Sequence, residues 1–126
     1  MKPDVVAVLA ETAALLVRNA APDVPPAERA GALGLSAALL GFAAQAWDAA
    51  AHNLVQENRA IRTLLGEVGS DEDLRLSALS AENDRLRAGL IALHIAVEGK
   101  DPAKEAAIWA ELVASTERRM VVGSPV

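Results

Sequence analysis

The sequence contains no cysteine and very few aromatic residues. Its 126 residues include no tyrosine, one phenylalanine and two tryptophans. Without cysteine, the chain can form neither a disulfide nor a thiolate nucleophile or metal ligand, which fits a reducing cytoplasm. The shortage of aromatic residues disfavours a sheet, because strands favour β-branched and aromatic side chains, whereas abundant alanine and leucine favour closely packed helices. The sequence therefore predicts an all-α protein located in the cytoplasm.

The chain also lacks an excess of basic residues. It has 12 lysines and arginines against 17 aspartates and glutamates, which gives a net charge of -5 at pH 7. An acidic chain has no net attraction for phosphate backbones or for anionic membrane surfaces. We therefore expect no nucleic acid among its partners.

An uncharged run covers residues 30–47, and its 18 residues reach the length at which a membrane span must be considered. Alanine and glycine dominate this run, which also contains Ser36 and Gln45. These residues insert into a bilayer far less favourably than leucine or phenylalanine. We therefore expect no membrane span here.

Apolar residues recur at three-to-four-residue spacing along most of the chain, which is typical of helices with one buried face. Breaks at the prolines of 21–26, at Gly69 and at Gly99 divide this pattern. The predicted helices cover about 3–20, 26–68, 71–98 and 102–119, with a flexible tail at 120–126. The sequence thus predicts a single domain over 1–126, an antiparallel four-helix bundle with an unusually long second helix and coiled-coil-like packing.

Two helix starts are predicted from local capping patterns. Gly69 is expected as a left-handed cap, with Ser70 as the next N-cap and Asp73 closing a capping box. Gly99 should stop the third helix, and Pro102 suits the first turn of the fourth. In this last helix we expect an inward face, made of Ile108, Trp109, Leu112 and Val113.

A twelve-residue pattern, L-x-x-E-N-x-x-[IL]-R-x-x-L, occurs twice, beginning at Leu54 and at Leu79. In heptad terms Asn58 and Asn83 both take an a position, where a buried asparagine fixes register or partner number and must have its amide paired. The alternative is a chance similarity between two leucine-rich helices.

The uncharged run also bears on assembly, because a helix that is apolar on all sides must be buried on all sides. Small residues at four-residue spacing let helix backbones approach closely. We expect a homodimer through this region; the alternative is burial within one chain by the first and fourth helices. The candidate residues for self-association are Gly34, Ala37, Ala38, Gly41, Asn58 and Asn83.

No set of residues points to catalysis. The sequence contains no E-x-x-H motif, no G-x-S-x-G motif and no glycine-rich phosphate loop after a strand, so we expect neither an enzyme nor a cofactor. In a hairpin of the second and third helices, His52 and His94 are offset by roughly 15 Å, too far to share an ion within one chain; the alternative is that a symmetric dimer brings them together. The arginines should pair with nearby acids, Arg85 with Glu82 and Arg75 with Asp71.

Two hypotheses from different classes follow. The first is a non-enzymatic helical interaction module, an oligomeric accessory or regulatory protein whose partner presents another helical surface. The second is a helical bundle that binds a small molecule or a metal between its helices. Its candidate pocket consists of Phe42, Trp47, His52, His94 and Trp109.

Overall fold

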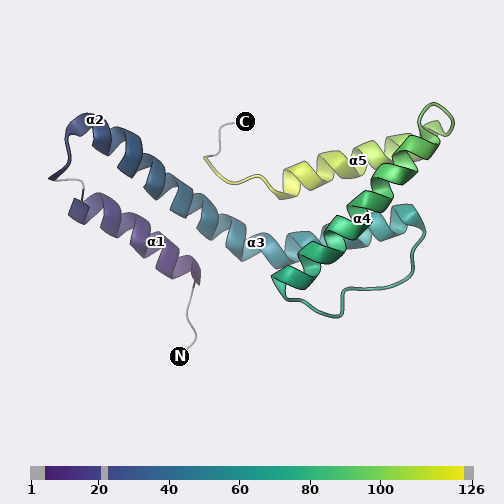
Figure 1. The fold of residues 1–126 in the computed structure, drawn as a ribbon, viewed down its shortest axis with the longest axis horizontal. Helices are drawn as coiled ribbons and strands as arrows, with labels where there is room; N and C mark the ends of the chain where they lie inside the picture. The colour runs from purple at the N-terminus through teal and green to yellow at the C-terminus, as the bar shows by residue number, and fades with distance from the viewer. Residues whose placement is uncertain (1–4, 21–22, 124–126) are drawn as a thin grey trace. The chain divides into compact units, whose positions relative to one another are not determined.

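Helices form every long element of the chain in the computed structural model, which describes residues 5–20 and 23–123 (Figure 1). No strand occurs in these two ranges. The prediction of an all-α helical bundle is confirmed. The chain divides into two compact units, 1–49 with 121–126 and 50–120, which are described separately below.

In the first unit, α1 (Val5–Leu15) continues directly into a π-helical turn, η1 (Leu16–Ala20). A short α2 (Pro26–Glu28), a second π-helical turn η3 (Arg29–Leu33) and α3 (Gly34–Leu65) follow without a break. Together these last three form one helix of 40 residues, roughly 60 Å long at 1.5 Å per residue. The predicted long second helix is therefore present, and Gly31 lies in its π-helical turn.

The second unit contains the second half of α3, α4 (Leu76–Val97) and α5 (Pro102–Arg118). Buried side chains on α4 follow in steps of four, three, four and seven residues, from Leu79 to Val97, which is the heptad spacing expected from the sequence. Side chains from all three helices meet in one apolar core. The buried core residues are Ile61, Leu86, Leu90, Val97 and Ile108, with Leu64, Leu65, Leu93 and Leu112 packed against them.

The segment between α3 and α4 differs from its prediction. The left-handed residue that ends α3 is Gly66, with φ of +70°, and α4 begins only at Leu76, without a side-chain cap. The predicted capping box at Ser70 and Asp73 is therefore wrong, because the acids of this segment have other partners. Asp71, in the loop, accepts a hydrogen bond at 2.7 Å from Arg62 of α3 and does not cap a first helical turn.

The turn between α4 and α5 confirms its prediction. Gly99 has φ of +68°, a conformation that glycine adopts without strain, and it follows directly after the helix. The Asp101 carboxylate accepts a hydrogen bond from the Lys104 backbone N–H at 3.1 Å, and Pro102 occupies the first turn. This is an N-cap that satisfies one of the free donors at the start of a helix.

The inward face of α5 is narrower than predicted. Ile108 is buried and Leu112 is partly buried, whereas Trp109 and Val113 are exposed. Residues 109 and 113 lie about 100° around the helix from 108 and 112, so one packed face does not include both pairs. The expected inward positions of Trp109 and Val113 are therefore wrong.

The end of the chain returns to the first unit. Val122 donates a backbone hydrogen bond to Gln45 Oε1 at 2.9 Å, and Gln45 Nε2 donates to the Val122 carbonyl at 3.4 Å. The predicted flexible tail therefore includes a residue with two hydrogen bonds to α3, while its last three residues lie outside the described part of the chain.

Candidate functional site

The two copies of the repeated pattern face each other in the second unit. Asn83 Nδ2 donates to Asn58 Oδ1 at 3.0 Å, which pairs the two asparagines. The glutamate of each copy binds the arginine of the other: Glu57 with Arg87 at 2.6 Å, and Glu82 with Arg62 at 2.9 Å. Leu65 of α3 lies against Gly89 of α4 as Asn58 lies against Asn83, so the two helices run in the same direction and the 66–75 loop returns along α3 (Figure 1). The antiparallel hairpin expected for these two helices is therefore wrong, and three polar contacts fix a parallel register instead.

Glu57 is the most enclosed carboxylate of this polar cluster. Its side chain is 3% exposed and accepts hydrogen bonds from Arg87, from Arg119 at 2.7 Å and from the Ser115 hydroxyl at 2.9 Å. Burial by itself raises the pKa of a carboxyl group, but the hydrogen bonds from Ser115 and Asn83 and the charge of Arg119 outweigh it, so the pKa of Glu57 is lowered. One carboxylate thus connects α3, α4 and the end of α5.

At the other end of the polar cluster, Arg62 binds the loop that precedes α4. Arg62 is buried and bonds both Asp71 and Glu82, and the Asp71 contact is the main reason that the pKa of Arg62 is raised. Arg85 pairs with Glu82, as predicted, and also with Glu67 at 2.7 Å. Hydrogen bonds from Arg85, and then from Arg62, lower the pKa of Glu82 to about 2.

Arg75 was expected to pair with Asp71, which is wrong. Its guanidinium contacts the Asp73 carboxylate two residues away, and both side chains are substantially exposed. Such a surface pair contributes little to stability. In the polar cluster around Glu57 and Arg62, by contrast, acidic and basic side chains from different helices neutralise one another. This arrangement stabilises the packing of the helices.

The candidate self-association residues fall into two groups. Asn58 and Asn83 are buried against each other within one chain. In the first unit, Gly34, Ala37 and Gly41 are half-buried and Ala38 is exposed. The most exposed large apolar side chains of this part of α3 lie on its other face, where Leu35, Leu39 and Trp47 are 60%, 56% and 51% exposed.

The candidate pocket residues are distributed over both units. Phe42 is half-buried and Trp47 is exposed in the first unit, while His52 is exposed in the second. Only His94 and Trp109 are brought together, with their rings edge to face and 5.6 Å between centroids. Within the described residues, no three histidine, cysteine, aspartate or glutamate side chains gather in a group that could hold a metal ion.

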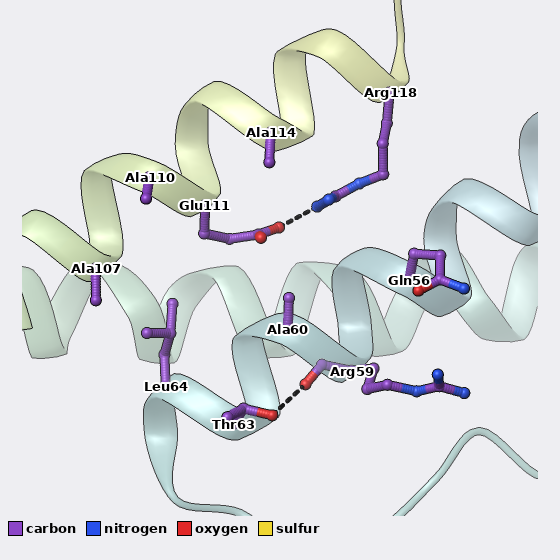
Figure 2. A pocket seen from close by; sticks show the side chains of 10 residues that line it. All are labelled: Gln56, Arg59, Ala60, Thr63, Leu64, Ala107, Ala110, Glu111, Ala114 and Arg118. Carbon is purple, nitrogen blue, oxygen red and sulfur yellow. Dashed lines mark hydrogen bonds and ion pairs between the residues drawn. The ribbon is translucent and has the colours of Figure 1, made fainter.

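A groove of about 560 Å³ lies between α3 and α5 within the second unit (Figure 2). Its floor is made mostly of alanine, and a pair formed by Glu111 and Arg118 lies along the α5 wall. The Arg118 Nε is buried and has no hydrogen-bond partner. The lining residues are Gln56, Arg59, Ala60, Thr63, Leu64, Ala107, Ala110, Glu111, Ala114 and Arg118.

This groove was not predicted from the sequence, although the sequence carries a signal for it. Ala107, Ala110 and Ala114 recur at the spacing of one helical face, where a packed bundle would normally place larger side chains. Alanine is common both in cores and on surfaces of helices, so the spacing shows a face without showing that the face is hollow.

One helix, Pro26–Leu65, is long and apolar enough to cross a membrane by length and composition alone, and little of its most apolar window is buried. Comparison with protein-family models, with curated proteins and with solved structures finds no match to this chain. The features of this chain that bear on its function are therefore the exposed apolar face of α3, the polar cluster and the groove.

Proposed function

We propose that this chain is a non-enzymatic helical interaction module that forms a homodimer through the outer face of α3 in its first unit. The observation that carries the proposal is the exposure of Leu35, Leu39 and Trp47 within a run of 18 uncharged residues. In the first half of α3, only Ala44 is fully buried. An apolar helix face of this kind is stabilised when another surface covers it.

The chemistry of the face favours a second copy of the chain over lipid. Leu35, Leu39 and Trp47 project as large side chains, while Ala43 and Ala46 leave shallow places between them. Two such faces can interdigitate, because each large side chain meets a small residue of the other copy. Gln45 is bonded to Val122, and the Asp48 side chain is exposed, so this stretch carries polar groups that a bilayer interior disfavours.

The polar cluster supports the same proposal from the other unit. Register between α3 and α4 is set by paired asparagines and by exchanged glutamate–arginine contacts. Buried polar contacts of this kind favour one arrangement over its alternatives, which suits a scaffold that presents a defined surface. The absence of nucleic acid, of a membrane and of an enzymatic activity, and a cytoplasmic location, remain predictions.

Sedimentation equilibrium and native mass spectrometry test the proposal directly. We expect a wild-type mass of twice 13.1 kDa at micromolar concentration, and weaker association with a lower average mass for the Leu35→Glu/Leu39→Glu variant. Leu74→Glu is the matched control, because Leu74 is equally exposed but lies in the loop before α4, and this variant should stay dimeric. A monomeric wild-type protein, or one that binds neutral lipid vesicles and loses this binding in the double variant, would refute the proposal.

A further inference from the structure

The groove between α3 and α5 has the features of an open place in a helical bundle. Ala60 from α3 and Ala107, Ala110 and Ala114 from α5 give it an apolar floor, and a helix is the element that fills a groove between two helices (Figure 2). The buried Nε of Arg118 lacks a hydrogen-bond acceptor, which is a rare condition for a buried polar atom. A matching occupant is therefore helical, apolar along one face and able to bring a carboxylate to Arg118.

Helix α1 carries such a face. Val8, Glu11, Leu15 and Arg18 follow in steps of three, four and three residues, so they share one side of the helix and its π-helical extension. Val8 and Leu15 are exposed, and α1 contains no buried residue. Glu11 and Arg18 pair with each other at 3.4 Å, but both are more than 60% exposed, so this pair is easily given up.

The charges of α1 match those of the groove in spacing and in order. Residues 10–18 and 110–118 both read A-E-x-x-A-x-x-x-R, so each helix carries a glutamate and an arginine seven residues apart. When two such helices lie antiparallel, each glutamate comes opposite the arginine of the other, since 11 + 118 and 18 + 111 both equal 129. In that register Leu15 faces Ala114, and a large side chain meets the alanine floor.

We propose that α1 of a second copy of this chain lies antiparallel to α5 in the groove, with its Glu11 at Arg118 and its Arg18 at Glu111. The exchange replaces two ion pairs within single helices by two between helices, and the Glu11 carboxylate supplies the acceptor that Arg118 Nε lacks. The contact is separate from the Leu35 and Leu39 face and does not depend on it.

Disulfide trapping tests this contact cleanly, because the chain has no cysteine of its own. A Leu15→Cys chain and an Ala114→Cys chain are mixed and oxidised, and we expect a crosslinked heterodimer as the main product. The matched control replaces Ala114→Cys with Val113→Cys, an adjacent and exposed position that does not line the groove, and should crosslink at least tenfold less. Equal crosslinking of the two cysteine positions would overturn the proposal.

Charge reversal provides the second readout. Glu11→Arg in the Leu15→Cys chain should reduce crosslinking at least fivefold, and Arg118→Glu in the Ala114→Cys chain should restore it. Failure of this rescue, with both chains folded by circular dichroism, would refute the proposed register. A single chain that carries both Leu15→Cys and Ala114→Cys provides a further check. If it forms the disulfide only within one chain, even at high protein concentration, the second copy is refuted as the occupant. Repeating the experiment with Leu39→Glu in both chains separates this contact from the α3 dimer, since crosslinking should persist there.

Discussion

Replacing Glu57 with glutamine isolates the charge of the polar cluster while keeping its shape. The carboxylate accepts hydrogen bonds from Arg87, Arg119 and Ser115, and its side chain is 3% exposed. In Glu57→Gln the two arginines lose their anionic partner, and one amide nitrogen now faces groups that donate hydrogen bonds. The substitution should therefore destabilise the unit that contains α4 and α5.

The size of this destabilisation depends on how well water can replace the hydrogen bonds that each partner of Glu57 loses. A hydrogen bond to a charged group contributes about 1.5 to 3 kcal/mol. The Arg87 and Arg119 side chains are 40% and 51% exposed, so water recovers much of their loss and the two contacts must be discounted. Ser115 is buried and recovers little. We expect a loss of about 2 kcal/mol in unfolding free energy, or roughly 8 °C in melting temperature.

Urea unfolding followed by circular dichroism at pH 7 measures this loss, with Glu72→Gln as the control because Glu72 is exposed in the loop. The pH dependence gives a second check. The pKa of Glu57 is lowered on folding, so its stabilising contribution is present above the ordinary value of 4.5 and disappears as the pH falls through the lower, folded value. The gap between wild type and Glu57→Gln should thus narrow below about pH 4. A gap under about 0.5 kcal/mol at pH 7, or one unchanged at pH 3, would contradict the assigned role.

Substitutions at Asn58 and Asn83 test the register, and a substitution at Gly66 tests the end of α3. Asn58→Leu or Asn83→Leu alone should cost about 1 to 3 kcal/mol by leaving the other amide unpaired, and the double variant should cost less than the sum of both in urea unfolding. Additive losses would show that the two asparagines do not act as a pair. Gly66→Ala should lower the unfolding free energy by about 1 kcal/mol, because Gly66 has φ of +70°; Gly31→Ala, at a position with open space around a Cβ, should not.

Most of the helices could be predicted from the sequence, because apolar spacing and the Gly99, Asp101 and Pro102 stop-and-start pattern are local signals. The same reasoning failed at Ser70 and Asp73, where a capping box is locally plausible. There, Asp71 in the loop forms an ion pair with Arg62 of the preceding helix, and Arg62 is itself held by Glu82 of α4. A local pattern predicts a cap only where no distant partner competes for its side chains.

The candidate site was predicted only in part, for a related reason. The heptad positions of Asn58 and Asn83 indicate that both are buried, but spacing along one chain does not say whether the partner amide belongs to the same chain. The structure gives that answer by placing them 3.0 Å apart within one chain. Predicting the groove would also have required knowing which helices are neighbours, since it exists only because an alanine face of α5 lies beside Ala60 of α3.

The two proposed contacts make different demands on symmetry. The outer face of α3 pairs with the same face of another copy, so it closes as a two-fold dimer and leaves no further site. The contact of α1 with the groove joins unlike surfaces, and it closes only if two copies exchange their α1 helices reciprocally. One-way docking would instead leave a free α1 at one end and a free groove at the other, which gives growing chains. If the groove contact forms, as the Leu15→Cys and Ala114→Cys crosslink would show, a single dimeric mass across concentrations requires reciprocal exchange between the same two copies. A ladder of masses that Glu11→Arg abolishes requires one-way docking.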